Sequence, residues 1–185
     1  MATTSDFRNG MTIELSGEYY TVTEFLHVKP GKGQAFVRTK LKNVQSGAVR
    51  EKTFKVGEKI EDVEIEKREA EYLYSAGNSY FFMDRESFEQ VTVSDDLVRN
   101  AVPFLKENLV INLLKIGEKL VGIDLPFFVI LKVTETEPGL RGDTVSAASK
   151  PARLETGTTV KVPLFVEKGD LIKVDTRTGE YVERA

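Results

Sequence analysis

The chain has 185 residues, of which 41% are apolar, 30% charged and 9% aromatic, and its net charge is −3. This length and composition allow a buried core in one domain or a few small ones, which excludes an intrinsically disordered protein. Cysteine is absent and His27 is the one histidine, which excludes disulfides, a thiolate nucleophile and sites built from several Cys or His ligands. Because no apolar run approaches the roughly 18 residues of a membrane span and no signal peptide is evident, we expect a cytoplasmic protein without a membrane partner.

Apolar and polar residues alternate with period two along most of the chain, and glycine turns interrupt the alternation. Strands are therefore expected at residues 11–15, 20–23, 34–41, 49–54, 71–74, 80–83, 109–116, 119–124, 128–133, 159–162, 171–174 and 180–182. Many short strands joined by tight turns predict an all-β protein made of small antiparallel barrels. The one helix is expected at residues 95–108, where five apolar residues fall on one face: Leu97, Val98, Ala101, Phe104 and Leu105.

Two features suggest where the chain divides. An acidic run at residues 58–66 follows a basic segment, and Leu125-Pro126 resembles a joint. We therefore expect three units of about 60 residues, near the lower limit for independent cores. They are residues 1–64, 65–127 and 128–185.

Charge is distributed unevenly between these units. Residues 1–55 carry nine Lys and Arg against five Asp and Glu, a net +4, whereas residues 66–127 have a net −4 and residues 128–185 balance. A basic end on an acidic body indicates that this end approaches a polyanion, although ordinary scatter of charges is the alternative.

The segment Val28–Ala35 is the most unusual in the chain. Pro30 fixes φ and the glycines permit positive φ, so Lys32 is expected at the exposed apex of a hairpin between Gly31 and Gly33. The spacing of a phosphate-binding loop is absent. A plain surface turn with a solubilising lysine is the other interpretation.

A long polar loop is expected at residues 137–151, and it contains Arg141-Gly142-Asp143. Loops of this kind on a barrel often carry binding residues, and a disordered connector is the alternative. No base–nucleophile pair or convergent carboxylates are evident, and His27 is interpreted as a structural or contact residue rather than a general base. The sequence therefore does not predict an enzyme, a cofactor or a metal site.

Several segments in the same order along the whole chain resemble the bacterial translation elongation factor P family. They are FLHVKPGKGQAF at residues 25–36, FMD at 82–84, TEPGLRGDT at 136–144, VPLFV at 162–166 and IKVDTRTGEYV at 172–182. The resemblance implies an N-terminal SH3-like (KOW-type) domain and two OB-folds, in an L-shaped arrangement similar to tRNA. Asn108 departs from the pattern, since relatives often carry glycine there.

The resemblance also implies a function. Family members bind the 70S ribosome between the peptidyl and exit sites, position the CCA end of peptidyl-tRNA and relieve stalling at consecutive prolines. The ribosome is the catalyst, so the factor is not expected to be an enzyme. The partners implied are peptidyl-site tRNA, mRNA at the exit-site codon and an enzyme that modifies Lys32, and we expect a monomer.

The same resemblance implies roles for particular residues. Lys32 corresponds to the tip that contacts the CCA end, and its covalent modification is open among the lysine chemistries of the family, such as β-lysylation. The supporting tip residues are Pro30, Gly31, Gly33 and Gln34. The phosphate contacts are Lys29, Arg38, Lys40 and Lys42. The exit-site codon loop is Arg141, Gly142, Asp143 and Thr144.

Two alternatives share much of this pattern. A generic single-stranded RNA-binding OB protein would need aromatic stacking platforms and a strongly basic groove; Trp is absent and the two C-terminal units are not basic. An elongation-factor-P-like paralogue would share the fold, but Lys32 and the ending at residues 176–182 favour the factor itself.

Overall fold

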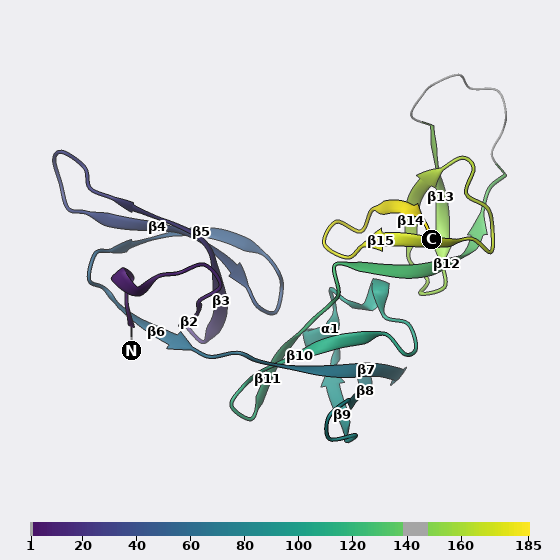
Figure 1. Cartoon of the computed structure of the whole chain (residues 1–185), viewed down its shortest axis with the longest axis horizontal. Helices are drawn as coiled ribbons and strands as arrows, with labels where there is room; N and C mark the ends of the chain where they lie inside the picture. Colours follow the sequence, from purple (N-terminus) through teal and green to yellow (C-terminus); the bar gives the residue numbers. More distant parts are fainter. Residues whose placement is uncertain (1, 139–147) are drawn as a thin grey trace. The chain divides into compact units, whose positions relative to one another are not determined.

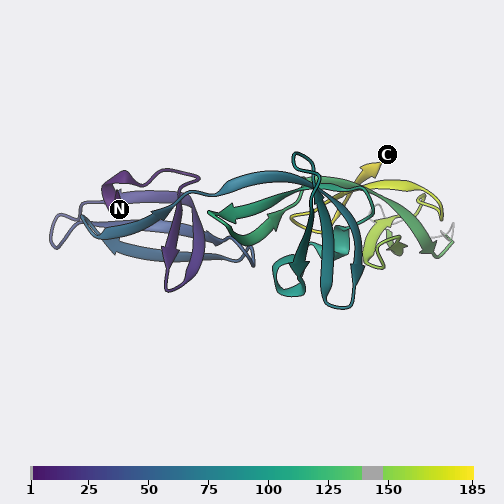
Figure 2. The ribbon, with the colours of Figure 1, turned by 90° about the horizontal axis from the view of Figure 1, so that it is seen from below.

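A computed structural model describes residues 2–138 and 148–185 of the chain. The predicted all-β class is confirmed, since the strands form three antiparallel sheets that can be followed by colour in Figures 1 and 2. The described residues include two single-turn 3₁₀ helices and one short α-helix. None of these helices has the length and apolar character needed to cross a membrane.

The first sheet has six strands in the order β1-β6-β2-β3-β4-β5. Their bounds are β1 Ala2–Thr3, β2 Thr12–Leu15, β3 Glu18–Val28, β4 Phe36–Asn43, β5 Val49–Lys55 and β6 Lys59–Val63, with the 3₁₀ helix η1 at Thr4–Asp6. Strand β4 shows the expected alternation along its whole length, with every second residue buried. The sheet encloses a core with buried side chains that include Ile13, Val22, Val37, Leu41 and Phe54.

The second sheet has five strands in the order β11-β10-β7-β8-β9. Their bounds are β7 Glu66–Ala76, β8 Ser79–Asp84, β9 Gln90–Ser94, β10 Val110–Ile116 and β11 Lys119–Asp124. Phe82 is fully buried at the centre of β8, where its ring lies 5.4 Å from that of Tyr72 on β7. Aromatic pairs of this kind add to the hydrophobic stabilisation of a small core.

The third sheet has five strands in the order β14-β13-β12-β15-β16. Their bounds are β12 Phe128–Thr136, β13 Ser149–Leu154, β14 Thr159–Pro163, β15 Leu171–Asp175 and β16 Tyr181–Arg184. The first half of β12 pairs with β15 and the second half pairs with β13, with a register shift between Val133 and Glu135. Such an irregularity lets one strand bend from one partner to another.

The helix expected at residues 95–108 is much shorter than predicted. It consists of α1 (Asp95–Val98) and the 3₁₀ helix η2 (Val102–Phe104). Pro103 lacks an N–H and its ring would clash with the carbonyl four residues earlier, so an α-helix cannot continue through it. The apolar face was nevertheless predicted well: Val98, Ala101, Phe104 and Leu105 are buried, and Leu97 is half-buried.

Four strands were missed by the sequence analysis: β1, β6, β9 and β13. Strand β6 lies inside the acidic run, where Ile60 is 2% exposed while the charged neighbours Lys59 and Glu61 point outward. Strand β13 begins at Ser149, so the polar loop expected to reach residue 151 ends earlier.

Contacts divide the chain into two compact units. One contains residues 1–68 with 113–122, and the other contains residues 69–112 with 123–185. Each unit has its own cluster of buried apolar side chains. The domain boundaries at residues 64 and 127 stay predictions.

Candidate functional site

Lys32 lies in the turn of the β3–β4 hairpin, which Figure 1 shows as a long pair of strands. The antiparallel pairing runs from Tyr20 opposite Asn43 to Val28 opposite Phe36, and β5 pairs with β4 over residues 36–42. Backbone hydrogen bonds along this length hold the turn at residues 29–35 on a supported stem.

The turn itself presents its side chains to solvent. Lys29, Pro30, Lys32 and Gln34 are all exposed, so the predicted exposure of the tip lysine is confirmed. Gly33 has φ of +113°, a value that L residues rarely adopt, and a Cβ there would lie 3.8 Å from the ring of Pro30. Gly31 is not among the glycines with positive φ, so of these two glycines only Gly33 adopts the positive φ that glycine permits.

Aromatic side chains support the stem below the turn. The ring of Phe25 lies 6.4 Å from Phe7 and meets His27 edge-on at 5.8 Å, while Phe7 packs against Phe54 at 5.3 Å. This chain of ring contacts connects the hairpin to the core of the first sheet. The edge-on contact with Phe25 gives His27 a place in this support of the stem.

The basic residues of β4 share one face of the sheet. Arg38 and Lys42 are exposed, whereas Lys40 is half-buried and its Nζ lies 2.8 Å from the carboxylate of Glu24 on β3. The hydrogen bond and charge of Glu24, with a further contribution from Glu51 opposite on β5, raise the pKa of Lys40. The positive charge at Lys40 is thus offset, and the exposed cations of this row are Arg38 and Lys42.

Two further basic residues lie on β5 and were not among the predicted contacts. The guanidinium of Arg50 lies 4.1 Å above the ring of Tyr20, and Nζ of Lys52 lies 5.2 Å from the ring of Phe54. Cation–π contacts of this kind hold a charge against an aromatic surface. Arg50 and Lys52 are separated from the buried Phe54 by an even number of residues, so the sequence indicates that all three lie on the same face of β5. Both basic side chains remain exposed.

The predicted codon-loop residues Arg141, Gly142, Asp143 and Thr144 lie outside the described residues. The strands that lead into and out of this segment are described. The hydroxyl of Thr136 donates to the carbonyl of Pro151 at 3.0 Å, and Nζ of Lys150 donates to the carbonyl of Glu137 at 2.6 Å. Side chains therefore connect the two strands at the end of their paired region.

An exposed aromatic and cationic cluster occurs at the start of β12. The guanidinium of Arg177 lies 4.8 Å from the ring of Phe127 and 5.8 Å from that of Phe128, and Nζ of Lys173 is 5.0 Å from Phe128. Asp175 accepts two hydrogen bonds from the Arg177 side chain, at 3.0 and 2.6 Å. These bonds from Arg177 lower the pKa of Asp175 to about 2. No local pattern in the sequence predicts this cluster.

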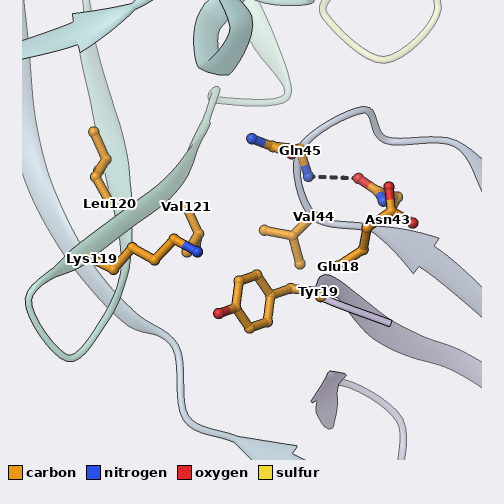
Figure 3. A pocket seen from close by; sticks show the side chains of 9 residues that line it. Glu18, Tyr19, Asn43, Val44, Gln45, Lys119, Leu120 and Val121 are labelled. Carbon is orange, nitrogen blue, oxygen red and sulfur yellow. Dashed lines mark hydrogen bonds between the residues drawn. The ribbon is translucent and has the colours of Figure 1, made fainter. Parts of the chain in front are cut away.

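A small pocket in the first unit is drawn in Figure 3. Its walls come from the β2–β3 turn, the turn after β4 and strand β11, and its volume is about 70 Å³. Nζ of Lys119 lies 5.3 Å from the ring of Tyr19, and Asn43 Oδ1 accepts from the backbone N–H of Gln45 at 2.9 Å. Ligand pockets are usually several times larger, and none of the predicted site residues lines this one. It is therefore a packing feature rather than a substrate site.

No group of three or more His, Asp or Glu side chains suited to a metal ion is present in residues 2–138 and 148–185. The arrangement as a whole offers exposed cations on a supported hairpin and on the first sheet. Exposed cations of this kind are suited to anionic and hydrogen-bond-accepting groups.

Comparison with known proteins agrees with these observations. Family models match residues 3–60 (elongation factor P KOW-like domain), 65–123 (elongation factor P OB domain) and 129–184 (elongation factor P, C-terminal). Elongation factor P of Natranaerobius thermophilus is 57% identical over 184 residues, which cover 100% of this chain and 98% of that protein. Elongation factor P of Pelotomaculum thermopropionicum is 56% identical, with 100% of both chains covered.

A solved structure, the translation initiation factor 5A from Methanococcus jannaschii, aligns with a TM-score of 0.47 at 15% identity, covering 66% of this chain and 94% of that one. The assignment depends instead on the full-length identity to the relatives and on the three matched segments. The chain belongs to the elongation factor P family of translation elongation factors.

Proposed function

We propose that the chain binds the 70S ribosome between the peptidyl and exit sites and positions the CCA end of peptidyl-tRNA, which relieves stalling at consecutive prolines. It acts in the cytoplasm as a monomer and as a positioning factor, while the ribosome catalyses peptide-bond formation. The observation that carries this proposal is the exposed Lys32 at the end of a long hairpin, next to Pro30 and the positive-φ Gly33.

Positioning is a sufficient source of rate enhancement for this reaction. Proline is a constrained and poor participant in peptide-bond formation, and a reacting group displaced by about 1 Å can lose on the order of 100-fold in rate. A hairpin whose strands are paired from Tyr20 to Val28 keeps its tip in place with little loss of entropy on binding. No covalent chemistry by the factor is required.

Lys32 contributes hydrogen-bond donors to this role. An ammonium group can donate to phosphate and ribose oxygens near the CCA end, and a covalent extension of the side chain would carry donors further. The side chain is exposed, so a modifying enzyme can reach it. We propose Lys32 as the position of such a modification.

Binding should depend on salt through the basic face of the first sheet. Replacing Arg38, Lys40 and Lys42 by alanine is expected to reduce the slope of log affinity against log salt by about 1–2, because phosphate contacts release counterions. Most of the change is expected from Arg38 and Lys42, since Glu24 offsets the charge of Lys40. Co-sedimentation with ribosomes carrying peptidyl-tRNA, at several salt concentrations, measures the slope.

Lys161→Ala is the control for this experiment, since Lys161 is exposed on β14, outside the first sheet. It should leave the slope unchanged. Equal slopes for the wild type and the triple variant would show that these three side chains do not contact phosphate.

Asp143→Ala tests the proposed contact with mRNA at the exit-site codon. Loss of one charge-assisted hydrogen bond to RNA should lower the rate of tri-proline synthesis about tenfold or more. The measurement is the rate in a purified translation system, together with a thermal melting curve of the variant. A normal rate from a normally folded variant would remove Asp143 from the binding site.

A further inference from the structure

Phe88 combines a strongly exposed aromatic side chain with an unusual backbone conformation. It lies in the turn between β8 and β9, is 73% exposed and has φ of +60°. Bulky L residues rarely adopt this left-handed conformation, because Cβ comes too close to the following carbonyl oxygen. A phenylalanine at this position therefore gains little from burial and is held in a strained backbone.

The hydrogen bonds of the turn impose this backbone conformation. Asp84, which is 3% exposed, accepts at Oδ1 from the amides of Glu86 and Ser87 at 2.8 and 2.9 Å. Its main-chain oxygen accepts from the amide of Phe88 at 2.9 Å, and its own amide donates to the carbonyl of Glu89 at 2.9 Å. The turn is thus closed on both sides of Phe88 and holds it in one place.

Two other turns of the chain are built in the same way and show which residue suits this position. After β4, Asn43 accepts at Oδ1 from the amides two and three residues later and at its main-chain oxygen from Gly47, which has φ of +70°. After β15, the main-chain oxygen of Asp175 accepts from Gly179, which has φ of +75°. Because glycine adopts this conformation without strain, the needs of the turn do not account for Phe88.

The charges of the β8–β9 turn indicate what kind of surface it fits. Glu86 and Glu89 are exposed, whereas the positive charge of Arg85 is offset by Glu69, whose carboxylate lies 3.2 Å away. Residues 66–127 have a net charge of −4. Carboxylates repel the phosphates of RNA and attract lysine and arginine side chains. The complementary surface is therefore that of a basic protein.

We propose that Phe88 anchors a protein-docking site, in which its ring enters an apolar pocket of a basic protein while Glu86 and Glu89 pair with cations at the rim. A buried aromatic anchor surrounded by polar contacts is the usual source of binding energy in protein interfaces. The closed turn is already in its bound shape, so little entropy is lost on docking. The inference rests on the proposed binding to the ribosome, and the partner is one of the ribosome's basic proteins.

Phe88→Gly separates binding from folding. Glycine relieves the left-handed backbone, which offsets its greater freedom in the unfolded chain, so the variant should melt at or slightly above the wild-type temperature. Its affinity for ribosomes carrying peptidyl-tRNA, measured by co-sedimentation, should fall about tenfold or more. Phe88→Leu keeps an apolar side chain and should lose less affinity. A clearly lower melting temperature for Phe88→Gly would show that Phe88 is a structural residue and would overturn the inference.

The sign of a charge effect identifies the class of partner. The double variant Glu86→Gln, Glu89→Gln should bind ribosomes more weakly if these carboxylates face lysine and arginine, and more tightly if they face phosphates. The segment between β14 and β15 supplies a control for each change, since Phe165 and Glu167 are both exposed there. Phe165→Ala and Glu167→Gln should leave the affinity unchanged.

A photoreactive phenylalanine analogue at position 88 identifies the partner directly. In the complex with purified ribosomes it should crosslink to a ribosomal protein. Crosslinks confined to RNA or to a second copy of the chain, or no crosslink at all, would overturn the inference.

The outcomes also distinguish this inference from the proposed function. If the wild type binds ribosomes and Phe88→Gly binds them equally well, the docking site is wrong and the proposed function stands. If the wild type does not bind ribosomes, the proposed function fails and the docking site fails with it.

Discussion

Lys32→Ala is expected to reduce the rate of tri-proline synthesis to that of ribosomes without factor. The side chain is exposed and the turn is shaped by Pro30 and Gly33, so the free energy of unfolding should change by no more than about 0.5 kcal/mol. Affinity for the ribosome should stay near normal, because the basic face of the first sheet is intact. A loss in rate without a loss in binding identifies a contact that acts in the transition state.

Two further variants sharpen this result. Lys32→Arg keeps the charge but prevents lysine-specific modification, and its rate should fall between those of the wild type and Lys32→Ala. Lys161→Ala removes an exposed lysine from β14 and should have no effect. Full-rate synthesis with Lys32→Ala would show that the hairpin is not the working tip.

Phe54→Ala should give the largest loss of stability among single changes in the first sheet. The ring is 2% exposed, packs against Phe7 at 5.3 Å and lies opposite Val37 of β4. Truncating a buried phenylalanine costs about 3–5 kcal/mol through lost burial and the cavity left behind. Denaturant unfolding, followed by a probe in the first sheet, measures the change.

Phe165→Ala is the matched control, since Phe165 is 60% exposed and its removal opens no cavity in a core. Its free energy of unfolding should change by no more than about 0.5 kcal/mol. A change below about 1 kcal/mol for Phe54→Ala would mean that the β4–β5 pair does not depend on this core.

Much of the fold could be predicted from alternation alone. Strands such as β4 and β15 bury every second residue and are bounded by turn residues, which is the simplest signal of a strand. Strand β6 was missed because its exposed residues are mostly charged and only Ile60 is buried. The helix was overestimated because apolar spacing was given more weight than the break that Pro103 imposes.

The candidate site could be predicted from the sequence only in part. The exposed lysine of the turn follows from local chemistry, because proline and glycine act on their own backbone. The partner of Lys40 does not, since a register shift between Val22 and Glu24 decides that Glu24 lies opposite it. The hydrogen bond from Lys150 to Glu137 likewise depends on the pairing of β12 with β13, which no local pattern specifies.

The most direct test of the proposed function is the rate of peptide-bond formation in a purified translation system. The chain should be isolated from its own cell, so that Lys32 carries its natural modification if there is one. We expect the chain to accelerate synthesis of a tri-proline peptide and to leave synthesis of a tri-phenylalanine peptide nearly unchanged, because only the poorly oriented substrate benefits from positioning. Equal rates of tri-proline synthesis with and without the chain would contradict the proposed function.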